Sequence, residues 1–391
     1  MYIFEEVAAQ AITHLKKQDK TGAYDKLDTL HAFSAQLTQD LQAISHDLHF
    51  SVTVMPPRMI TDRAEVDQEA MRRNYLNRAR RSNYGFRKLE ILPGNVGYLD
   101  LRQFADASIG GPTAIAAMNY LAGCESIIID LRSNGGGSPS MIGVISSYFF
   151  DKPTHLNDFY TRSSDSTQEF WTHAEVQGPR LTDTPLYILT GARTFSAAEE
   201  FSYNFRNLKR ATLVGETTGG GAHPVSRMQY PQHGVSMSLP SGRAINPITG
   251  TNWEGVGVKP HIEVPAREAL DRAYAEALDQ ILTDTEDEVQ KRQLQWVLEG
   301  LQAKEVRLSP GQQSAFSGTF GPRRIWAEKG QMFYQRGSGA TLRLTHMGND
   351  HFDLEGLDSF RIRFERSADG KVTTLVGRYD EGREEANPRN E

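Results

Sequence analysis

From Ser126 to Gly137 the chain reads SIIIDLRSNGGG, an apolar run followed by three consecutive glycines. The run Ile127–Leu131 has the length and composition of a buried strand. Consecutive glycines allow backbone N–H groups to point outward, where they can hold an anion or a developing oxyanion. A tight strand-to-helix turn without a ligand explains the same letters equally well. No Gly-Lys-Ser/Thr follows the glycines, so this is not a phosphate-binding P-loop.

Around this stretch, from Gly94 to Pro265, short apolar strands alternate with helical patterns. The predicted strands are Val96–Leu101, Ile127–Leu131, Leu186–Leu189 and Thr212–Val214. The predicted helices are Pro112–Leu121, Ser140–Phe149, Ala197–Asn207 and, closing the unit, Arg267–Leu282. Such alternation is typical of α/β layering.

The flanking segments have other patterns. Residues Phe4–Leu41 repeat apolar side chains at helical spacing, and Phe50–Val54 alternates as a strand. The polar, arginine-rich segment Arg58–Lys88 is expected to be a solvated helix or a linker. A further helix is expected over Glu286–Leu301.

From Ser309 onward, short strands separated by glycine turns predict a small antiparallel β domain. The charged tail Asp380–Glu391 is expected to be disordered. The sequence therefore predicts three parts: a helical N-terminal part with a first core strand and a linker (1–90), an α/β core (91–283), and a helix followed by an accessory β domain (284–391).

Composition excludes several classes of protein. The chain has 391 residues and a net charge of −6, which gives no basic field for nucleic acid. No apolar run approaches the ~20 residues that cross a bilayer. The single cysteine, Cys124, excludes an intrachain disulfide. An amphipathic pattern begins at Met1, with no signal peptide before it. The start therefore resembles that of a mature sequence. We expect an exported protein, either periplasmic or secreted.

A second candidate segment, Gly191–Glu200, follows one predicted strand and opens a predicted helix. Ser196 and Glu199 have the spacing of a capping box, in which Ser196 would simply cap the helix. Caps are far more frequent than nucleophiles. The alternative is a reactive serine hydroxyl at the positive end of a helix, with N–H donors near it for an oxyanion.

Two further glycine-rich segments carry ionisable side chains. One runs from Gly215 to Pro224 and contains His223, and the other runs from Trp253 to Pro260 and contains Glu254. Alone, the first is typical of a flexible loop and the second of an exposed turn.

Taken together and in this order, the four segments resemble the tail-specific (C-terminal-processing) serine peptidases. The matching motifs are DLRxNxGG from Asp130, SAAE from Ser196, VGExTxG from Val214 and EGxGVxP from Glu254. The resemblance is strong over Val96–Pro265 and weaker back to about Tyr2. It implies a ClpP/crotonase-like core and an acylating serine at Ser196.

The resemblance also indicates a branch of this family. Members with a Ser–Lys dyad have a lysine in the segment matching Thr217–Pro224, and this chain has none there. The segment instead resembles the tricorn core and the interphotoreceptor retinoid-binding protein modules. That branch implies His49 as the base and Glu254 as the group that orients it, directly or through a bridge. The oxyanion would be held by the N–H of Gly135 or Gly136 and by that of Ala197.

Two departures from the branch stand out. Tricorn-like sites have a serine directly before the histidine, where this chain has Leu48. Residues Arg58–Lys88 are too few for a PDZ domain, which removes the expected tether for C-terminal tails. His223 remains an alternative base or a substrate contact. His46 and His49 could form a metal pair, but no third ligand has a recognisable spacing, so neither a metal nor a cofactor is expected.

The resemblance implies peptide hydrolysis through an acyl-enzyme, with a peptide or an unfolded protein as substrate and no nucleic-acid partner. Two alternatives remain open: a non-catalytic module that binds an apolar ligand or a peptide, and a crotonase-type acyl-CoA enzyme. The latter has no need of Ser196 paired with Glu254. The oligomeric state is left open.

Overall fold

A computed structural model of the chain describes residues 2–57, 60, 67–303 and 306–390. The chain forms two compact units, Met1–Tyr274 and Ala275–Glu391, which divide within helix α7 (Ala269–Asp284). The three-part division expected from the sequence stays a prediction. Within the described residues, no helix is long and apolar enough to cross a membrane.

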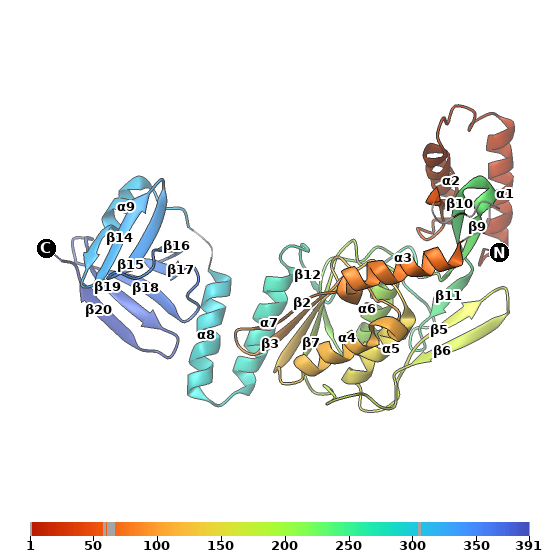
Figure 1. Cartoon of the computed structure of the whole chain (residues 1–391). Coiled ribbons are helices and arrows are strands. Elements are labelled where there is room, and N and C mark those ends of the chain that lie inside the picture. The colour runs from red at the N-terminus through yellow and green to blue at the C-terminus, as the bar shows by residue number, and fades with distance from the viewer. Residues whose placement is uncertain (1, 58–59, 61–66, 304–305, 391) are drawn as a thin grey trace. The chain divides into compact units, whose positions relative to one another are not determined.

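The first unit contains a six-stranded sheet in the order β12-β8-β7-β4-β3-β2 (Figure 1). From β3 to β12 neighbouring strands are parallel, and β2 is antiparallel at one edge. The bounds are β2 Phe86–Leu92, β3 Val96–Leu101, β4 Ser126–Asp130, β7 Leu186–Thr190, β8 Thr212–Gly215 and β12 Ile262–Glu263. Because the carboxyl ends of parallel strands share one edge, the loops after β4, β7 and β8 emerge together.

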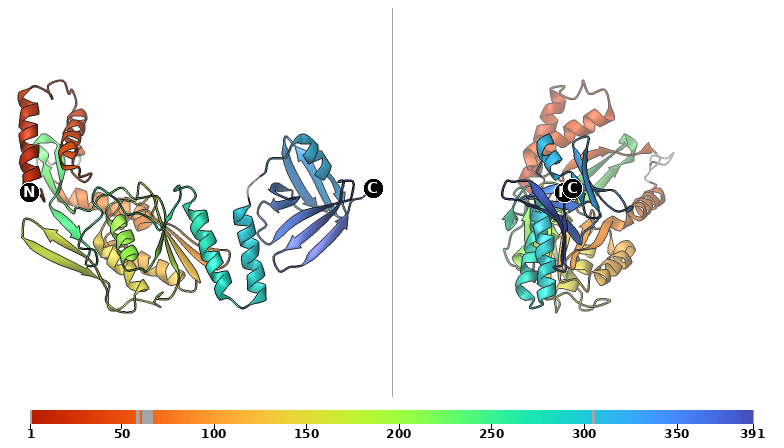
Figure 2. Two further views of the ribbon diagram at one scale, coloured as in Figure 1. Left: turned by 180° about the vertical axis from the view of Figure 1, so that it is seen from behind. Right: turned by 90° about the vertical axis from the view of Figure 1, so that its left-hand side faces the viewer.

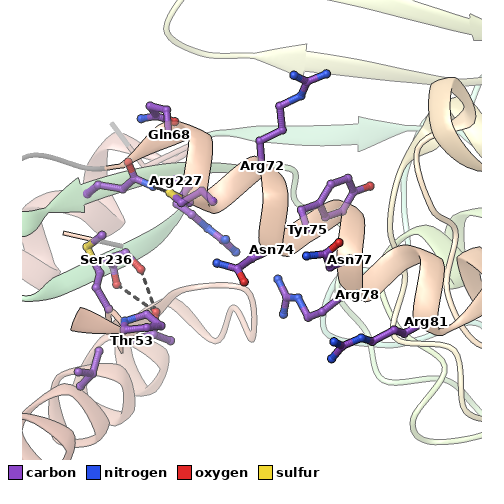
Figure 3. Close-up of a pocket in the computed structure, with 15 residues that line it drawn as sticks. Thr53, Gln68, Arg72, Asn74, Tyr75, Asn77, Arg78, Arg81, Arg227 and Ser236 are labelled. Carbon is purple, nitrogen blue, oxygen red and sulfur yellow. Dashed lines mark hydrogen bonds between the residues drawn. The ribbon is translucent and has the colours of Figure 1, made fainter. Parts of the chain in front are cut away.

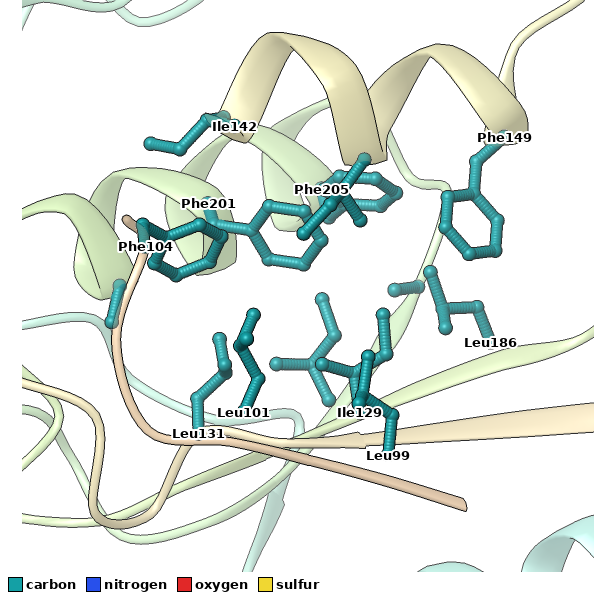
Figure 4. Packing of buried hydrophobic residues seen from close by; sticks show 14 of the residues in the cluster. Leu99, Leu101, Phe104, Ile129, Leu131, Ile142, Phe149, Leu186, Phe201 and Phe205 are labelled. Carbon is teal, nitrogen blue, oxygen red and sulfur yellow. The ribbon is translucent and has the colours of Figure 1, made fainter. Parts of the chain in front are cut away.

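Three helices, α4 (Ala107–Tyr120), α5 (Pro139–Ser146) and α6 (Ala197–Asn207), pack on this sheet. Figure 4 shows side chains of the strands, such as Leu99 and Ile129, facing Phe201 and Phe205 of α6. All five residues of β4 are buried, as expected for a parallel strand that is covered on both faces. This core holds the carboxyl edge of the sheet in place.

The N-terminal part of this unit consists of α1 (Glu5–Lys20) and α2 (Leu30–Ser45), which lie beside a three-stranded antiparallel sheet (Figure 2). Its order is β1-β10-β9, with β1 Ser51–Val54, β9 Val225–Tyr230 and β10 Val235–Pro240. A second small sheet has the order β11-β5-β6, with β5 His155–Thr161, β6 Ser166–Trp171 and β11 Gly242–Ile245. The sequence analysis identified β1 but not the other strands of these two sheets.

The segment Arg58–Lys88 contains helix α3 (Gln68–Arg81), then a short 3₁₀ turn (Asn83–Gly85) and the start of β2. Part of this segment, 58–59 and 61–66, lies outside the described residues. Helix α4 begins five residues before the predicted start at Pro112, because the Asp106 carboxylate accepts the Ser108 N–H (2.9 Å) and caps it.

The second unit contains α8 (Glu288–Gln302), α9 (Pro310–Phe316) and eight antiparallel strands that pair in chain order. The strands are β13 Gly318–Phe320, β14 Arg323–Glu328, β15 Gln331–Arg336, β16 Leu342–Gly348, β17 His351–Leu354, β18 Phe360–Arg366, β19 Val372–Tyr379 and β20 Glu384–Pro388. A bridge between Phe320 and Arg389 brings the end of the sheet back to its first strand. The predicted α/β class, with a helical N-terminal part and a C-terminal antiparallel β domain, is confirmed.

The expectation that the tail Asp380–Glu391 is disordered is wrong. Strand β20 pairs with β19, and Glu385 binds the buried guanidinium of Arg323 (2.7 Å). Charge made the tail resemble a solvated segment, but one of its carboxylates neutralises a cation that the fold has buried.

Candidate active site

The four motif segments meet at the carboxyl edge of the six-stranded sheet. The Phe195 N–H donates to the Asn134 carbonyl oxygen (3.0 Å), and the Gly219 N–H donates to that of Thr194 (3.0 Å). The Gly255 N–H donates to the Gly220 carbonyl oxygen (2.9 Å). These backbone bonds join segments that are distant in the sequence into one framework.

Glu199 is the centre of this framework. Its buried carboxylate accepts the backbone N–H groups of Ser196 (2.9 Å), Gly220 (2.6 Å) and Gly221 (2.8 Å), and the Thr218 hydroxyl (2.5 Å). Burial raises the pKa of Glu199, and these donors oppose the rise. The Glu199 side chain therefore accepts the Ser196 N–H, as expected from a capping box. It also joins the serine turn (Thr194–Ala197, which carries Ser196) to the loop after β8.

Ser196 itself has an unusual backbone conformation. Its φ and ψ are 56° and −122°, whereas an ordinary N-cap residue is extended with negative φ. Such a conformation is strained for a residue with a side chain and persists only where the surroundings enforce it. A strained serine between a strand and a helix is also the geometry that exposes the hydroxyl of a nucleophile elbow. The backbone of Ser196 thus differs from that of a simple cap.

The predicted oxyanion donors differ in whether their N–H groups already have an acceptor. In the part of the chain that the structure describes, the N–H groups of Gly135 and Ala197 have no hydrogen-bond acceptor. The Gly136 N–H donates to Oδ1 of Asn134 (2.9 Å). That bond occupies the Gly136 N–H, and the oxyanion role of the two glycines stays a prediction. Gly136 matters sterically instead, because a Cβ there would lie 2.8 Å from the Cβ of Ser196.

His49 lies beside the serine turn. Its ring is 4.6 Å from the ring of Phe195, and its Nδ1 is 4.0 Å from Oδ1 of Asp47. Burial lowers the pKa of His49; the Asp47 charge opposes the shift, and His223 adds to it. Among the described contacts, no hydrogen bond joins the His49 ring to the Ser196 hydroxyl. The structure therefore brings His49 against the residue that precedes Ser196, without a direct bond to the serine.

The third group of side chains is buried next to His49. His223 Nδ1 is 2.7 Å from Oδ2 of Asp47 and 3.5 Å from Oε2 of Glu254. Burial and the Asp47 charge raise the pKa of Glu254 to about 7. The Ala222 N–H donates to Oε2 of Glu254 (2.5 Å). Glu254 and His223 are thus brought together, but the carboxylate that approaches His49 is Asp47.

The sequence analysis assigned no role to Asp47. Its Oδ1 accepts the backbone N–H of His49 (2.9 Å). This is a local turn that an aspartate can form with the backbone two residues further on, whatever residue stands there. Only the pairing with a residue 176 positions away distinguishes it. Nor do His46 and His49 gain a third metal ligand: within the described residues, the group of side chains with metal-ligand spacing is Asp47, His223 and Glu254.

Comparisons with known proteins identify the family of two segments of the chain. Residues 95–264 match peptidase family S41. Residues 1–80 match the N-terminal domain of peptidase S41 in eukaryotic IRBP. The first match contains Ser196, His223 and Glu254, and the second contains Asp47 and His49.

Among individual relatives, the chain is 33% identical over 129 residues to a carboxyl-terminal-processing protease of Synechocystis sp., covering 33% of this chain and 29% of the relative. It is 28% identical over 199 residues to a carboxyl-terminal-processing protease of Picosynechococcus sp., covering 48% and 46%. It is 27% identical over 167 residues to the tricorn protease of Thermoplasma volcanium, covering 41% and 15%. The chain thus spans less than half the length of these curated relatives.

Solved structures are more distant. A putative S41 protease from Bacteroides fragilis aligns with a TM-score of 0.43 and 20% identity, over 56% of this chain and 57% of that one. A photosystem II D1 C-terminal processing protease aligns with a TM-score of 0.37 and 22% identity, over 44% and 42%. The two family matches, the order of the motifs and their convergence on one edge of the sheet lead to one assignment: the chain contains a peptidase family S41 domain over residues 95–264, with the N-terminal domain of such peptidases before it.

Proposed function

We propose that this protein is a serine peptidase that hydrolyses peptide bonds through an acyl-enzyme on Ser196. The observation that carries the proposal is the strained backbone of Ser196 at the start of α6, next to two N–H groups that have no acceptor among the described residues. A helix cap needs neither feature. An acylating serine can use both, since a strained turn exposes its hydroxyl and the free N–H groups stabilise the oxyanion.

In this scheme Ser196 Oγ attacks the carbonyl carbon of the substrate while its proton passes to His49. The Gly135 and Ala197 N–H groups hold the oxygen that becomes negative. His49 then gives the proton to the leaving amine. In the second half of the reaction water loses a proton to His49 and attacks the acyl carbon, and Ser196 leaves with that proton. The lowered pKa of His49 keeps the imidazole neutral at pH 7 and so ready to accept a proton.

Glu254 acts on His49 through a bridge. Glu254 Oε2 lies 3.5 Å from His223 Nδ1, and His223 in turn holds Asp47 at 2.7 Å. Asp47 faces Nδ1 of His49 and fixes its backbone. We assign the role of orienting carboxylate to Asp47, with His223 and Glu254 as positioning residues. The scheme uses no metal ion and no organic cofactor.

The substrates we propose are peptides or unfolded proteins, as the family match suggests. The relatives named carboxyl-terminal-processing proteases support a processing role. We propose that this role is performed outside the cytoplasm. Fractionation of cells that express the native gene, followed by immunodetection, tests that location. A protein found only in the cytoplasmic fraction contradicts it.

A second candidate function is the binding of an apolar ligand without catalysis. A cavity of about 530 Å³ lies between α1, α2 and the β1-β10-β9 sheet. Apart from Glu5 and Arg162, its lining is mostly aliphatic and aromatic: Tyr2, Ala8, Ala9, Ala11, Ile12, Leu15, Leu37, Leu41, Phe50, Val52, Met237 and Leu239. Such a lining suits an acyl chain or a similar molecule.

Labelling with a serine-reactive fluorophosphonate separates the two candidates. We expect one adduct, on the peptide that contains Ser196, and none in Ser196→Ala. Ser133→Ala, which removes a hydroxyl from the neighbouring glycine loop, serves as the matched control and should label fully. Absence of the adduct in the folded parent protein, together with no digestion of unfolded casein, contradicts the peptidase and leaves the binding module.

A further inference from the structure

A groove of about 810 Å³ lies between helix α3 and the β1-β10-β9 sheet (Figure 3). Its lining comes from two elements that are distant in the sequence. Helix α3 contributes residues between Gln68 and Arg81. The sheet contributes Thr53, Val54, Arg227, Gln229 and Ser236, and Met55 and Pro56 after β1 complete the lining. None of these residues belongs to the candidate active site described above.

The charge of the groove is of one sign. The charged residues that line it are Arg72, Arg78, Arg81 and Arg227, and no aspartate or glutamate is among its described lining. Within the part of the chain described, none of the four guanidinium groups forms an ion pair, whereas the neighbouring Arg73 pairs with Glu69 (3.3 Å). Since the whole chain carries a net charge of −6, a groove with only cations is not a consequence of composition.

The helix dipole explains part of this pattern. Arg78 and Arg81 lie in the last turn of α3, where cations are favourable. The helix dipole does not explain the position of Arg227, because this residue lies on strand β9. In Figure 3 Arg78 and Arg81 extend from α3 to the side on which Arg227 lies, and Arg72 extends to the other side. Three arginines from two elements therefore face one groove.

The basic surface continues beyond the groove. Arg81 also lines an adjoining hollow of about 520 Å³, together with Arg87 and Arg102. Arg102 is neutralised by Asp100, with Nε–Oδ1 and Nη2–Oδ2 distances of 2.5 and 2.7 Å. The described lining of this second hollow likewise includes no acidic residue. Arg81 thus lines both basic depressions.

The groove is connected to the candidate active site by two strands. Strand β1 begins two residues after His49, and β9 begins two residues after His223. Both strands contribute side chains to the groove. A peptide that lies in the groove is therefore adjacent to strands that start at the proposed catalytic groups.

We infer that this arginine groove binds acidic side chains of an extended peptide substrate near the residues to be cleaved. The inference deepens the proposed peptidase function and rests on it. Guanidinium groups pair with carboxylates through two parallel N–H···O bonds, which suits Asp and Glu side chains. Alternate side chains of an extended peptide point to the same side, ~6.6 Å apart, so carboxylates at alternate positions can all face the arginines. An Asp/Glu-x-Asp/Glu pattern therefore matches the groove.

The test measures binding without turnover. The Ser196→Ala protein, with all 391 residues, is titrated into peptides that are N-acetylated and C-amidated to remove the terminal charges and that carry the same rhodamine label, so that they differ only in side-chain charge. One peptide contains a Glu-x-Glu-x-Glu stretch, and its partner has Gln at the same positions. Fluorescence anisotropy at 50 mM and 500 mM NaCl gives the two dissociation constants.

We expect the Glu peptide to bind about tenfold more tightly than the Gln peptide at low salt, with most of the difference lost at high salt. Arg78→Gln combined with Arg227→Gln should weaken the Glu peptide to nearly the level of the Gln peptide. Arg73→Gln, on the same helix but outside the groove, is the matched control and should change little. Melting curves of all variants check that each is folded.

Equal binding of the two peptides overturns the inference. So does an equal loss in the Arg73→Gln control, which would show attraction to general surface charge. Failure of the peptidase proposal is distinguishable, because binding is measured on a variant without the serine hydroxyl. If the parent does cleave, the Arg78→Gln/Arg227→Gln variant should raise KM for acidic peptides and leave kcat unchanged, and a fall in kcat alone contradicts the binding role.

Discussion

Oδ2 of Asp47 lies 2.7 Å from Nδ1 of His223, a contact between residues 176 positions apart. One partner follows helix α2, and the other lies in the loop between β8 and β9. Both are almost fully buried, with 1% and 6% of their side chains exposed. The pair connects the N-terminal part to the peptidase domain at the place where His49 meets the serine turn.

Replacing Asp47 tests whether this contact serves catalysis. In Asp47→Asn we expect kcat to fall by about ten- to a hundredfold, because the amide orients the imidazole less well and does not stabilise its cation. The Asp47 charge raises the pKa of His49, so its loss should move the acid limb of kcat/KM to lower pH. A pH–rate profile measures both effects. A lower rate with an unmoved limb would indicate a structural role only.

The pH dependence of the parent tests His49 as the base. Since burial lowers the pKa of His49, the acid limb should lie below the ordinary histidine value of about 6.5. The base must be neutral to accept a proton, so activity is lost as the pH falls through this limb. His49→Ala should abolish the limb along with most of the rate. Unchanged activity in His49→Ala, together with inactivity of His223→Ala, would transfer the role of base to His223.

Substitution of Ser196 separates a nucleophile from a cap. A cap replaced by alanine costs ~1 kcal/mol and is partly restored by threonine. At φ 56° and ψ −122° we expect the reverse order, because a β-branched side chain is disfavoured at positive φ: Ser196→Thr melts below Ser196→Ala, and Ser196→Gly melts at or above it. All three variants, Thr included, should lose activity by several orders of magnitude. Thermal melts and single-turnover assays measure this, and substantial activity in Ser196→Ala would exclude the acyl-enzyme.

Gly221 offers a steric test of the site. A Cβ at this position would lie 2.3 Å from Cζ of Phe195 and 2.8 Å from Cε1 of His49. Gly221→Ala should therefore displace the Phe195 ring and the imidazole and reduce kcat at least tenfold. Gly123→Ala, where the new Cβ meets no atom within 4 Å, is the control. Equal kcat in both variants would show that His49 is not required at its observed position.

Glu200, buried in α6, predicts a pH dependence of stability. Burial raises its pKa to about 8, above the ordinary carboxyl value of 4.5. Its stabilising contribution is therefore complete below pH 4.5 and is lost as the pH rises through 8, with a slope that approaches ~1.4 kcal/mol per unit. Glu200→Gln should melt higher than the parent at pH 9 and similarly at pH 5. The exposed Glu175→Gln provides the control, and a parallel shift in both variants would contradict the assignment.

Several elements followed from local pattern alone. The bounds of α6 agree with the predicted Ala197–Asn207, and β4 lies within one residue of Ile127–Leu131. Local patterns sufficed there because each element is continuous in the sequence, and its apolar side chains recur at the spacing of the face that becomes buried. The strands β9 and β10 were missed because their side chains are mostly exposed or half-buried, so the apolar alternation is weak.

The sequence by itself determined the α/β class, the order of the four motif segments and the identity of Ser196, His49 and Glu254 as candidates. Tertiary structure alone decided which groups meet: that Asp47 is the carboxylate near His49, and that Asn134 occupies the Gly136 N–H. The physical reason is the separation along the chain of the residues that interact. Helix and strand preferences are set by neighbours in the chain, whereas a hydrogen bond or an ion pair requires a distance of a few ångströms that only the folded chain defines.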